Sequence, residues 1–325
     1  MSFQHIGIVG AGSWGTALAV LVSENRVPIT VWGHNAKHIA EVAAARENTA
    51  YLPGVALSDS LRFTAELDDL AACDLILFVT PSKAVREVAA RLSTTAVNRD
   101  AVLLSCTKGV ERGSGLRMSE IIAEFFPHNP VAVLSGPGHA EEVARKMPTA
   151  IVLGCRDAGV LQRLQPVFTA PFFRSYTSED VPGIELGGAL KNIFAIATGV
   201  ADGLGLGDNS KAALVTRSLA ELIRVGIALG GQRDTFQGLS GIGDLMVTCF
   251  SRHSRNRAVG ERLPDIVSSM NMVAEGVPTT YSAYECARRL DIETPIIDQM
   301  RLLLEGQFTA REVVTNLITR EPKAE

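Results

Sequence analysis

The chain has 325 residues, of which 46% are hydrophobic and 20% are charged. This length is sufficient for two domains with separate cores, and the composition is typical of a globular protein. The formal net charge of −4 gives no support to a nucleic-acid partner. The sequence contains no stretch of 18 consecutive apolar residues, so we expect no membrane span. The first predicted strand begins so early that we expect no signal peptide. Five cysteines without a C-x-x-C pair fit reduced thiols and no metal site, so we expect a cytoplasmic protein.

The first predicted elements are a short strand, a glycine-rich loop and a helix. The apolar run at 6–9 leads into Gly10-Ala11-Gly12-Ser13-Trp14-Gly15, and a helix is expected through about Ser23. In such a unit, Gly10 allows the turn, Gly12 lets the backbone approach a pyrophosphate, and Gly15 lets the helix pack closely on the strand. The N–H groups at the helix start attract phosphates. The loop therefore predicts a dinucleotide-binding site.

The second predicted strand, at 29–32, ends without the acidic residue that NAD sites usually carry. It is followed by Gly33-His34-Asn35, and Lys37 comes shortly after. A carboxylate there would bind the ribose 2′-hydroxyl and repel a 2′-phosphate, whereas His34, Asn35 and Lys37 would not repel it. The sequence thus favours NADP(H), or the use of both NADP(H) and NAD(H). An alternative interpretation is that His34 is only a polar loop residue.

The remainder of the first half alternates apolar strand patterns with helical patterns. Ser82 is expected to cap a helix that runs through Arg91. This alternation predicts an α/β fold with a Rossmann-type, doubly wound parallel sheet. The further strands are expected at 74–79, 101–105, 131–134, 150–153 and 172–176.

The second half shows helical periodicity with few strand signals. Pro182-Gly183 is expected to break the chain, which divides it into a dinucleotide-binding Rossmann domain at 1–182 and a helical substrate-binding domain at 183–325. Thr309 and Glu312 form a capping-box pattern at the start of the last helix. Helices are expected at 184–201, 210–229, 255–262, 279–290, 295–305 and 309–319.

Two lysines are candidates for chemistry. Lys108 follows the strand at 101–105, and ligands bind beyond the carboxyl ends of strands in open α/β sheets. Lys191 lies among small and apolar neighbours, where loss of hydration disfavours the ammonium and adapts a lysine to proton transfer. The alternatives are a solvated Lys108 and a Lys191 that extends its amine to water.

Two polar segments accompany Lys191 in the second half. Asp244, within a glycine-punctuated stretch, is expected either to bind a lysine or substrate hydroxyl, or to cap a helix. The segment Ser251–Arg257 carries three arginines beside serine and asparagine at an expected helix start. Guanidinium groups and helix N–H groups suit a phosphate, and surface ion pairs are the alternative.

Taken together, these segments resemble the bacterial NAD(P)-dependent glycerol-3-phosphate dehydrogenase family over nearly the whole chain. The resemblance implies reversible reduction of dihydroxyacetone phosphate to sn-glycerol 3-phosphate by a homodimeric oxidoreductase that supplies phospholipid synthesis. The segments that carry the resemblance are G-A-G-S-W-G-T-A-L-A at 10–19, S-C-T-K-G at 105–109, S-G-P at 135–137, G-A-L-K-N at 188–192, D-G-L-G-L-G-D-N at 202–209, G-I-G-D-L at 241–245, S-R-N-R at 254–257 and V-A-E-G at 273–276.

The resemblance also implies roles for matching residues. Lys191 matches the catalytic lysine, and Lys108 and Arg255 match residues shared by cofactor and substrate. Further cofactor contacts are implied at Ser13, Trp14, His34, Ala140, Val273 and Glu275. Further substrate contacts are implied at Gly136, Gly138, Asp244, Ser254 and Asn256.

The chain departs from the family pattern after the Gly-Pro pair at 136–137. The family usually has serine or threonine followed by phenylalanine, whereas this chain has Gly138-His139. A contact at Gly138 would therefore come from the backbone or from water, or His139 would replace it. The competing hypotheses are a β-hydroxyacid dehydrogenase, which shares the domain plan and a lysine–asparagine pair, and a non-catalytic dinucleotide sensor.

Overall fold

The computed structural model describes residues 3–263 and 274–321, which fold into two compact units. The first unit contains Met1–Lys108 and Arg117–Glu185, and the second contains Gly109–Leu116 and Leu186–Glu325. Each unit has a hydrophobic core of its own. The division at Glu185 lies close to the predicted boundary at 182/183. The assignment of Gly109–Leu116 to the second unit was not predicted.

The first unit is built on an eight-stranded sheet with the order β3-β2-β1-β4-β5-β6-β7-β8. Neighbouring strands are parallel except β6 and β7. The order reverses between β1 and β4, where Ile8 of β1 pairs with Val31 on one side and with Leu77 on the other. This arrangement confirms the predicted Rossmann-type α/β fold. The strands are β1 (Ile6–Val9), β2 (Ile29–Trp32), β3 (Leu61–Thr64), β4 (Leu75–Phe78), β5 (Val102–Ser105), β6 (Val131–Ser135), β7 (Thr149–Gly154) and β8 (Phe173–Ser178).

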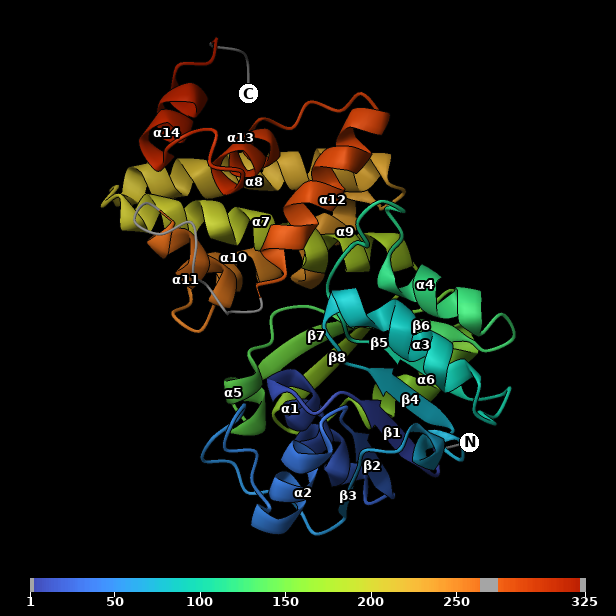
Figure 1. Ribbon diagram of the computed structural model, residues 1–325. Coiled ribbons are helices and arrows are strands. Elements are labelled where there is room, and N and C mark those ends of the chain that lie inside the picture. The colour runs from blue at the N-terminus through green and yellow to red at the C-terminus, as the bar shows by residue number, and fades with distance from the viewer. Residues whose placement is uncertain (1–2, 264–273, 322–325) are drawn as a thin grey trace. The chain divides into compact units, whose positions relative to one another are not determined.

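Helices flank this sheet (Figure 1). They are α1 (Ser13–Val22), α2 (Ala36–Ala45), α3 (Val85–Ser93), α4 (Met118–Phe125), α5 (Ala140–Ala144) and α6 (Ala158–Val167), with short 3-10 turns η1 (Ser23–Asn25), η2 (Leu67–Leu70) and η3 (Ser82–Ala84). Two details differ from the sequence prediction. Ser82 begins η3 instead of capping a helix, and α3 starts only at Val85. Strand β3 was missed because it lies at the sheet edge, where Arg62 is exposed and breaks the apolar run.

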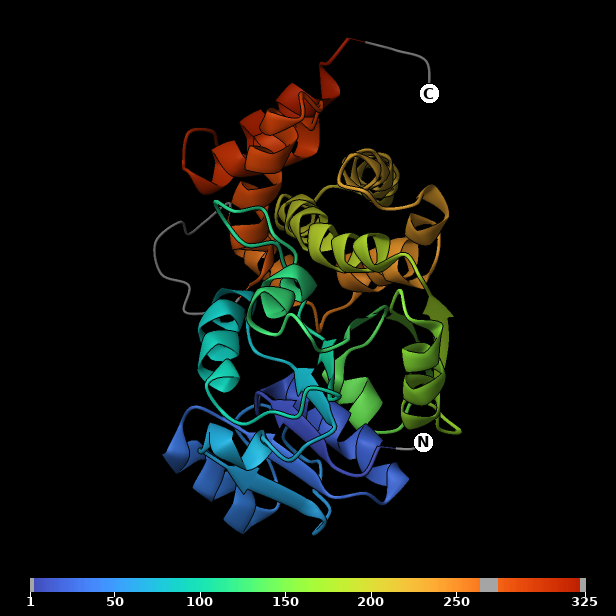
Figure 2. The ribbon, with the colours of Figure 1, turned by 90° about the vertical axis from the view of Figure 1, so that its right-hand side faces the viewer.

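The regular elements of the second unit are helices among its described residues, and α7 and α8 run side by side (Figures 1 and 2). The predicted capping box of α14 is confirmed, since the Thr309 N–H donates to Glu312 Oε2 at 2.7 Å and the Glu312 N–H donates to Thr309 Oγ1 at 3.3 Å. Its elements are α7 (Val181–Gly203, in this unit from Leu186), α8 (Asp208–Ala228), α9 (Arg233–Phe236), a π-helical turn η4 (Leu239–Gly243), α10 (Asp244–Phe250), α11 (Arg255–Arg262), α12 (Gly276–Arg289), α13 (Pro295–Leu304) and α14 (Ala310–Ile318).

Helix α7 supplies much of the core of the second unit. It is long and apolar enough to cross a membrane, but its most apolar stretch is entirely buried inside the protein, as in a core helix. Helix α11 approaches it closely because Gly260 has no side chain: a Cβ there would lie 1.9 Å from the Ile196 carbonyl oxygen. Pro182 and Gly183 do not break the chain. They lie in the first turn of α7, where a proline is tolerated because its missing N–H would have no partner.

Candidate active site

The glycine loop between β1 and α1 fits a dinucleotide pyrophosphate. Gly10 has φ +125°, and a Cβ there would lie 2.8 Å from the Val79 carbonyl oxygen. A Cβ on Gly15 would lie 1.9 Å from the Gly10 carbonyl oxygen, so that glycine permits the close packing of α1. At Gly12, by contrast, a Cβ would meet no atom within 4 Å. No side chain caps α1, which leaves its start open to an anionic ligand.

The ends of β4, β5 and β6 lie together at the edge of the sheet that carries this loop. The Thr107 hydroxyl donates to the Thr80 carbonyl oxygen at 2.7 Å, and Lys108 Nζ donates to the Gly136 carbonyl oxygen at 2.9 Å. The Thr80 hydroxyl oxygen is buried without a hydrogen-bond partner among the described residues. A buried polar atom of this kind, beside the loop at the strand reversal, fits the binding of a polar ligand.

Trp14 lies beside the glycine that follows the Gly-Pro pair. A Cβ on Gly138 would lie 3.1 Å from Trp14 Cη2, so a larger residue there would require a small shift of the indole ring. Ala140 begins α5, which packs against α1, the helix that carries Ser13 and Trp14. These residues of the first unit are thus brought together near the glycine loop.

Strand β2 ends at Trp32 and is followed by Gly33, His34 and Asn35. Trp32 is buried, and its Nε1 donates to the Ala65 carbonyl oxygen at 2.9 Å. His34 is exposed. The Asn35 side chain caps α2 by accepting a hydrogen bond from the His38 N–H at 3.1 Å. His34, Asn35 and Lys37 are thus all exposed after this strand, and none of them carries a negative charge.

Lys191 of α7 lies in a buried polar cluster of the second unit. Its Nζ is 2.8 Å from Asp244 Oδ1 and 2.5 Å from Thr248 Oγ1. The side chains of Lys191 and Asp244 are 8% and 1% exposed. Lys191 therefore does not extend to solvent, and Asp244, the first residue of α10, directs its carboxylate to the lysine instead of capping the helix. The carboxylate offsets the effect of burial, because a nearby opposite charge favours the ammonium.

Thr248 was missed at the sequence level. It lies one helical turn after Asp244 on α10, so the spacing of four residues was the available signal. Its hydroxyl donates to the Asp244 carbonyl oxygen at 2.6 Å, which leaves the oxygen lone pairs directed to Lys191. Asp244 and Thr248 together hold the amine of Lys191 at a fixed place.

A second buried chain of hydrogen bonds joins α7, α11 and α12. Asn256 Nδ2 donates to Asn192 Oδ1 at 2.9 Å, and Asn256 Oδ1 accepts from the Gly276 N–H at 2.9 Å. Asn192, which sequence reasoning also missed as a site residue, follows Lys191 directly. Ser254 caps α11, its hydroxyl accepting a hydrogen bond from the Arg257 N–H at 3.2 Å.

The three arginines near the start of α11 are not equivalent. Arg257 binds Asp202, with 2.6 Å between Nε and Oδ2, so this arginine forms an ion pair as in the alternative interpretation, although the pair is largely buried instead of lying at the surface. Arg252 and Arg255 are exposed, and Arg255 is the first residue of α11. Glu275 precedes α12 and accepts the Thr279 N–H at its carbonyl oxygen. Val273 lies outside the described residues.

The described part of the chain gives little support to a cysteine nucleophile or to a metal site. Burial raises the pKa of the Cys106 thiol far above its usual range, which suppresses the thiolate needed by a nucleophile. No group of three His, Cys, Asp or Glu side chains among the described residues is arranged to hold a metal ion.

A Rossmann-type unit with a pyrophosphate loop and a helical unit with a buried lysine–carboxylate pair define the class of nicotinamide-dependent dehydrogenases. Two family models match this chain. The model described as NAD-dependent glycerol-3-phosphate dehydrogenase N-terminus matches residues 5–160, and the corresponding C-terminus model matches residues 180–315. The chain belongs to the NAD-dependent glycerol-3-phosphate dehydrogenase family and is an NAD(P)-dependent oxidoreductase.

Individual relatives agree with this assignment. The chain is 45% identical to a glycerol-3-phosphate dehydrogenase [NAD(P)+] of Geobacter sp. (strain M21), over 99% of each chain. It is 44% identical to the enzyme of the same name from Syntrophotalea carbinolica, again over 99% of each chain. Among solved structures it is similar to glycerol-3-phosphate dehydrogenase from Coxiella burnetii, with a TM-score of 0.93, 35% identity, and coverage of 98% of this chain and 99% of that chain.

Proposed function

We propose that this protein reduces dihydroxyacetone phosphate to sn-glycerol 3-phosphate, reversibly, with Lys191 as the catalytic residue. The observation that carries the proposal is the buried cluster of Lys191, Asp244 and Thr248. Reduction of a ketone requires a hydride at the carbonyl carbon and a proton at the oxygen. The cluster offers a fixed ammonium for the proton, and the family relationship supports the triose phosphate as substrate.

In this proposal Lys191 acts as general acid. As negative charge grows on the substrate oxygen, the Lys191 ammonium stabilises it and then transfers a proton from Nζ to that oxygen. In the reverse direction the neutral amine accepts the proton of the hydroxyl. Asp244 and Thr248 orient Nζ and keep it from turning towards other acceptors. A bound nicotinamide supplies the hydride.

The binding roles implied by the family resemblance are also proposals. Arg255, Asn256 and Ser254 would anchor the substrate phosphate, with Lys108, Gly136 and the backbone at Gly138 contributing further contacts. Exposure of the Arg255 guanidinium supports this assignment, because it is free of the ion pair that occupies Arg257. The residues proposed to hold NADP(H) or NAD(H) are Gly10, Gly12, Ser13, Trp14, Gly15, His34, Lys108, Ala140, Arg255, Val273 and Glu275.

Initial rates with NADH and NADPH, in the presence of dihydroxyacetone phosphate, test the proposed reaction. We expect Lys191→Ala to lose at least about a hundredfold in turnover, the lower range for general acid catalysis, while cofactor affinity stays within about twofold. Lys146→Ala, which removes a partly exposed lysine that pairs with Glu24, is the matched control. A near-wild-type rate for Lys191→Ala would refute the catalytic role. Faster turnover of 3-oxo acids than of the triose phosphate would favour the β-hydroxyacid alternative.

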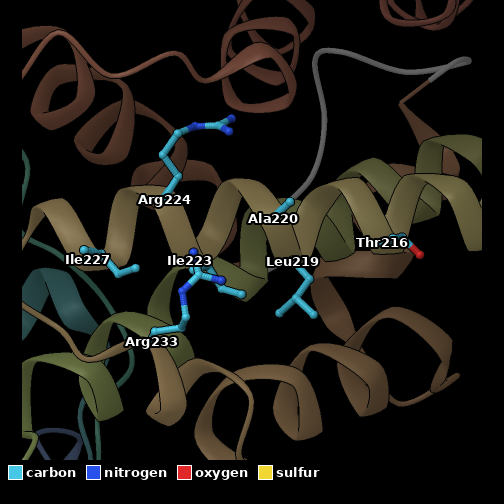
Figure 3. Close-up of a pocket in the computed structure, with 7 residues that line it drawn as sticks. All are labelled: Thr216, Leu219, Ala220, Ile223, Arg224, Ile227 and Arg233. Carbon is cyan, nitrogen blue, oxygen red and sulfur yellow. The ribbon is translucent and has the colours of Figure 1, made fainter. Parts of the chain in front are cut away.

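We further propose that the protein is a cytoplasmic homodimer that supplies glycerol phosphate for phospholipid synthesis. The cysteines at 73, 106, 155, 249 and 286 are all free of disulfides, which supports a reducing compartment. An apolar groove of about 550 Å³ along α8 supports a second copy of the chain as partner (Figure 3). Leu219, Ile223 and Ile227 line it at helical spacing, with Arg233 of α9 beside them.

A further inference from the structure

A segment of eight residues between the two parts of the first unit belongs to the second unit. The chain leaves the first unit after Lys108, folds Gly109–Leu116 into the second unit, and returns at Arg117. We call Gly109–Leu116 the tether. Val110 of the tether is buried in the core of the second unit. Because one peptide bond joins Lys108 to the tether, the place where the tether is held bears directly on Lys108.

Helix α12 holds the middle of the tether through one carboxylate and one ring. Glu285 accepts hydrogen bonds from Arg112 Nε at 3.4 Å and from the Gly113 N–H at 3.2 Å. The Arg112 guanidinium also lies over the Tyr281 ring, 4.8 Å from its centroid. Tyr281 and Glu285 are four residues apart and therefore share one face of α12. This face fixes both a side chain and a backbone group of the tether.

The tether is a closed turn and not a loose loop. The Glu111 N–H donates to the Leu116 carbonyl oxygen at 2.9 Å, and the Gly115 N–H donates to the Glu111 carbonyl oxygen at 3.0 Å. Gly115 has φ +74°, and a Cβ there would lie 2.9 Å from Cys286 Sγ of α12. A turn with these internal bonds transmits a displacement from its middle to its ends.

The residues that flank the tether are fixed in the first unit. On one side, Lys108 Nζ donates to the Gly136 carbonyl oxygen. On the other side, Arg117 pairs with Glu185 at 2.5 Å, and the Ser119 N–H donates to Glu185 Oε1 at 2.9 Å. Lys108 is thus held between a bond in its own unit and the anchored turn that follows it.

We propose that Glu285 is a positioning residue for Lys108. Through Arg112 and Gly113 it anchors the tether, and the tether keeps the Lys108 ammonium in place for the anionic substrate. This inference rests on the proposed role of Lys108 in substrate binding. Glu285 lies on α12, far from Lys108 in the sequence, and its hydrogen bonds go to Arg112 and Gly113 of the tether.

Steady-state kinetics of Glu285→Ala test this inference. Because the ion pair with Arg112 is partly exposed, we expect a moderate effect: the KM for dihydroxyacetone phosphate rises about threefold to fivefold, and kcat stays within about twofold. Glu285→Gln keeps an acceptor for the Gly113 N–H and should show a smaller rise. Glu293→Ala is the matched control, because Glu293 forms an exposed ion pair with Arg320 in the same unit. A similar KM in Glu285→Ala and Glu293→Ala would overturn the inference.

The double variant Lys108→Ala/Glu285→Ala separates this inference from the function on which it rests. If Glu285 acts through Lys108, its substitution should add nothing to the KM of Lys108→Ala. If the two effects multiply, Glu285 acts independently of Lys108 and the inference is wrong, while the substrate role of Lys108 stands. If Lys108→Ala leaves the KM unchanged, the proposed role of Lys108 fails and the inference fails with it.

Discussion

At the scale of single residues, Lys191 differs from an ordinary solvated lysine because its ammonium has fixed partners. Lys191 is buried, yet its ammonium is matched by the Asp244 carboxylate and the Thr248 hydroxyl. A buried ion pair of this kind is weak support for stability, because desolvation offsets much of the attraction. The pair matters instead because it fixes the position of the Lys191 amine. An amine with two fixed partners keeps one direction for proton transfer.

His34 determines the cofactor preference in our interpretation. We expect His34→Asp to lower the ratio of kcat/KM for NADPH to that for NADH by at least about tenfold, because a carboxylate repels the 2′-phosphate and accepts hydrogen bonds from a 2′-hydroxyl. Initial rates with both cofactors measure this ratio. His34→Asn is the control, since it changes shape without adding charge. An unchanged ratio in His34→Asp would show that the 2′-phosphate binds elsewhere.

At the scale of secondary structure, the N-terminus of α13 is capped by a carboxylate from another helix. Thr294, the residue before α13, makes no capping bond with its side chain. Instead, Glu221 of α8 accepts the N–H groups of Ile296 at 3.0 Å and Ile297 at 2.8 Å. This replaces a local cap by a tertiary one. The start of α13 therefore depends on its packing against α8.

Glu221 also predicts a pH dependence of stability. Burial raises the pKa of Glu221 from 4.5 to about 7, against the hydrogen bonds from Ile296 and Ile297 and the nearby Arg224, while Asp298 acts in the same direction as burial. Because the folded state binds this proton more tightly than the unfolded state, the contribution of Glu221 to stability is greatest below pH 4.5 and is lost as the pH rises through 7.

We therefore expect Glu221→Gln to flatten the loss of unfolding free energy between pH 5 and pH 8. The full difference corresponds to about 3 kcal/mol, as an order of magnitude for a shift of this size. Urea unfolding at several pH values measures it, with Glu261→Gln of α11 as control. Parallel pH curves for wild type and Glu221→Gln would show that this carboxylate does not titrate in this range.

At the scale of the whole molecule, the groove along α8 predicts the assembly state. Ile227 is 42% exposed and lines this groove together with Leu219 and Ile223, so a second copy of the chain would cover the three apolar side chains at once. We expect light scattering to give twice the chain mass for the wild type and one chain mass for Ile227→Glu, because a buried charge would oppose association. Ile318→Glu is the control, since Ile318 on α14 is 74% exposed and lies outside the groove. A dimeric Ile227→Glu would exclude this face.

What could be predicted from the sequence depended on how local each signal is. The glycine loop could be located from the spacing of its glycines, and the buried strands from their apolar runs, because both signals lie within a few neighbouring residues. The roles of Thr248, a partner of Lys191, and of Asn192, a partner of Asn256, could not be identified, because these contacts form only when α7, α10 and α11 pack. Asp244 could be proposed from its glycine-punctuated segment, and the family resemblance supplied the role of Asn256. The assignment of Gly109–Leu116 to the second unit could not be predicted. Its hydrogen bonds with Glu285 join residues more than 160 positions apart, and no local pattern indicates them.

The route of the tether also constrains how the chain is made. When the residues up to Glu185 have left the ribosome, the segments of the first unit are all present, but Arg112 and Gly113 have no partner at Glu285 until α12 has been synthesised. At elongation rates of about 5 to 20 residues per second, that delay is on the order of ten seconds. During this interval the tether lacks its anchor on α12. Nascent chains should therefore be most open to proteolysis and chaperone capture at this turn, and should lose that sensitivity when Glu285 emerges.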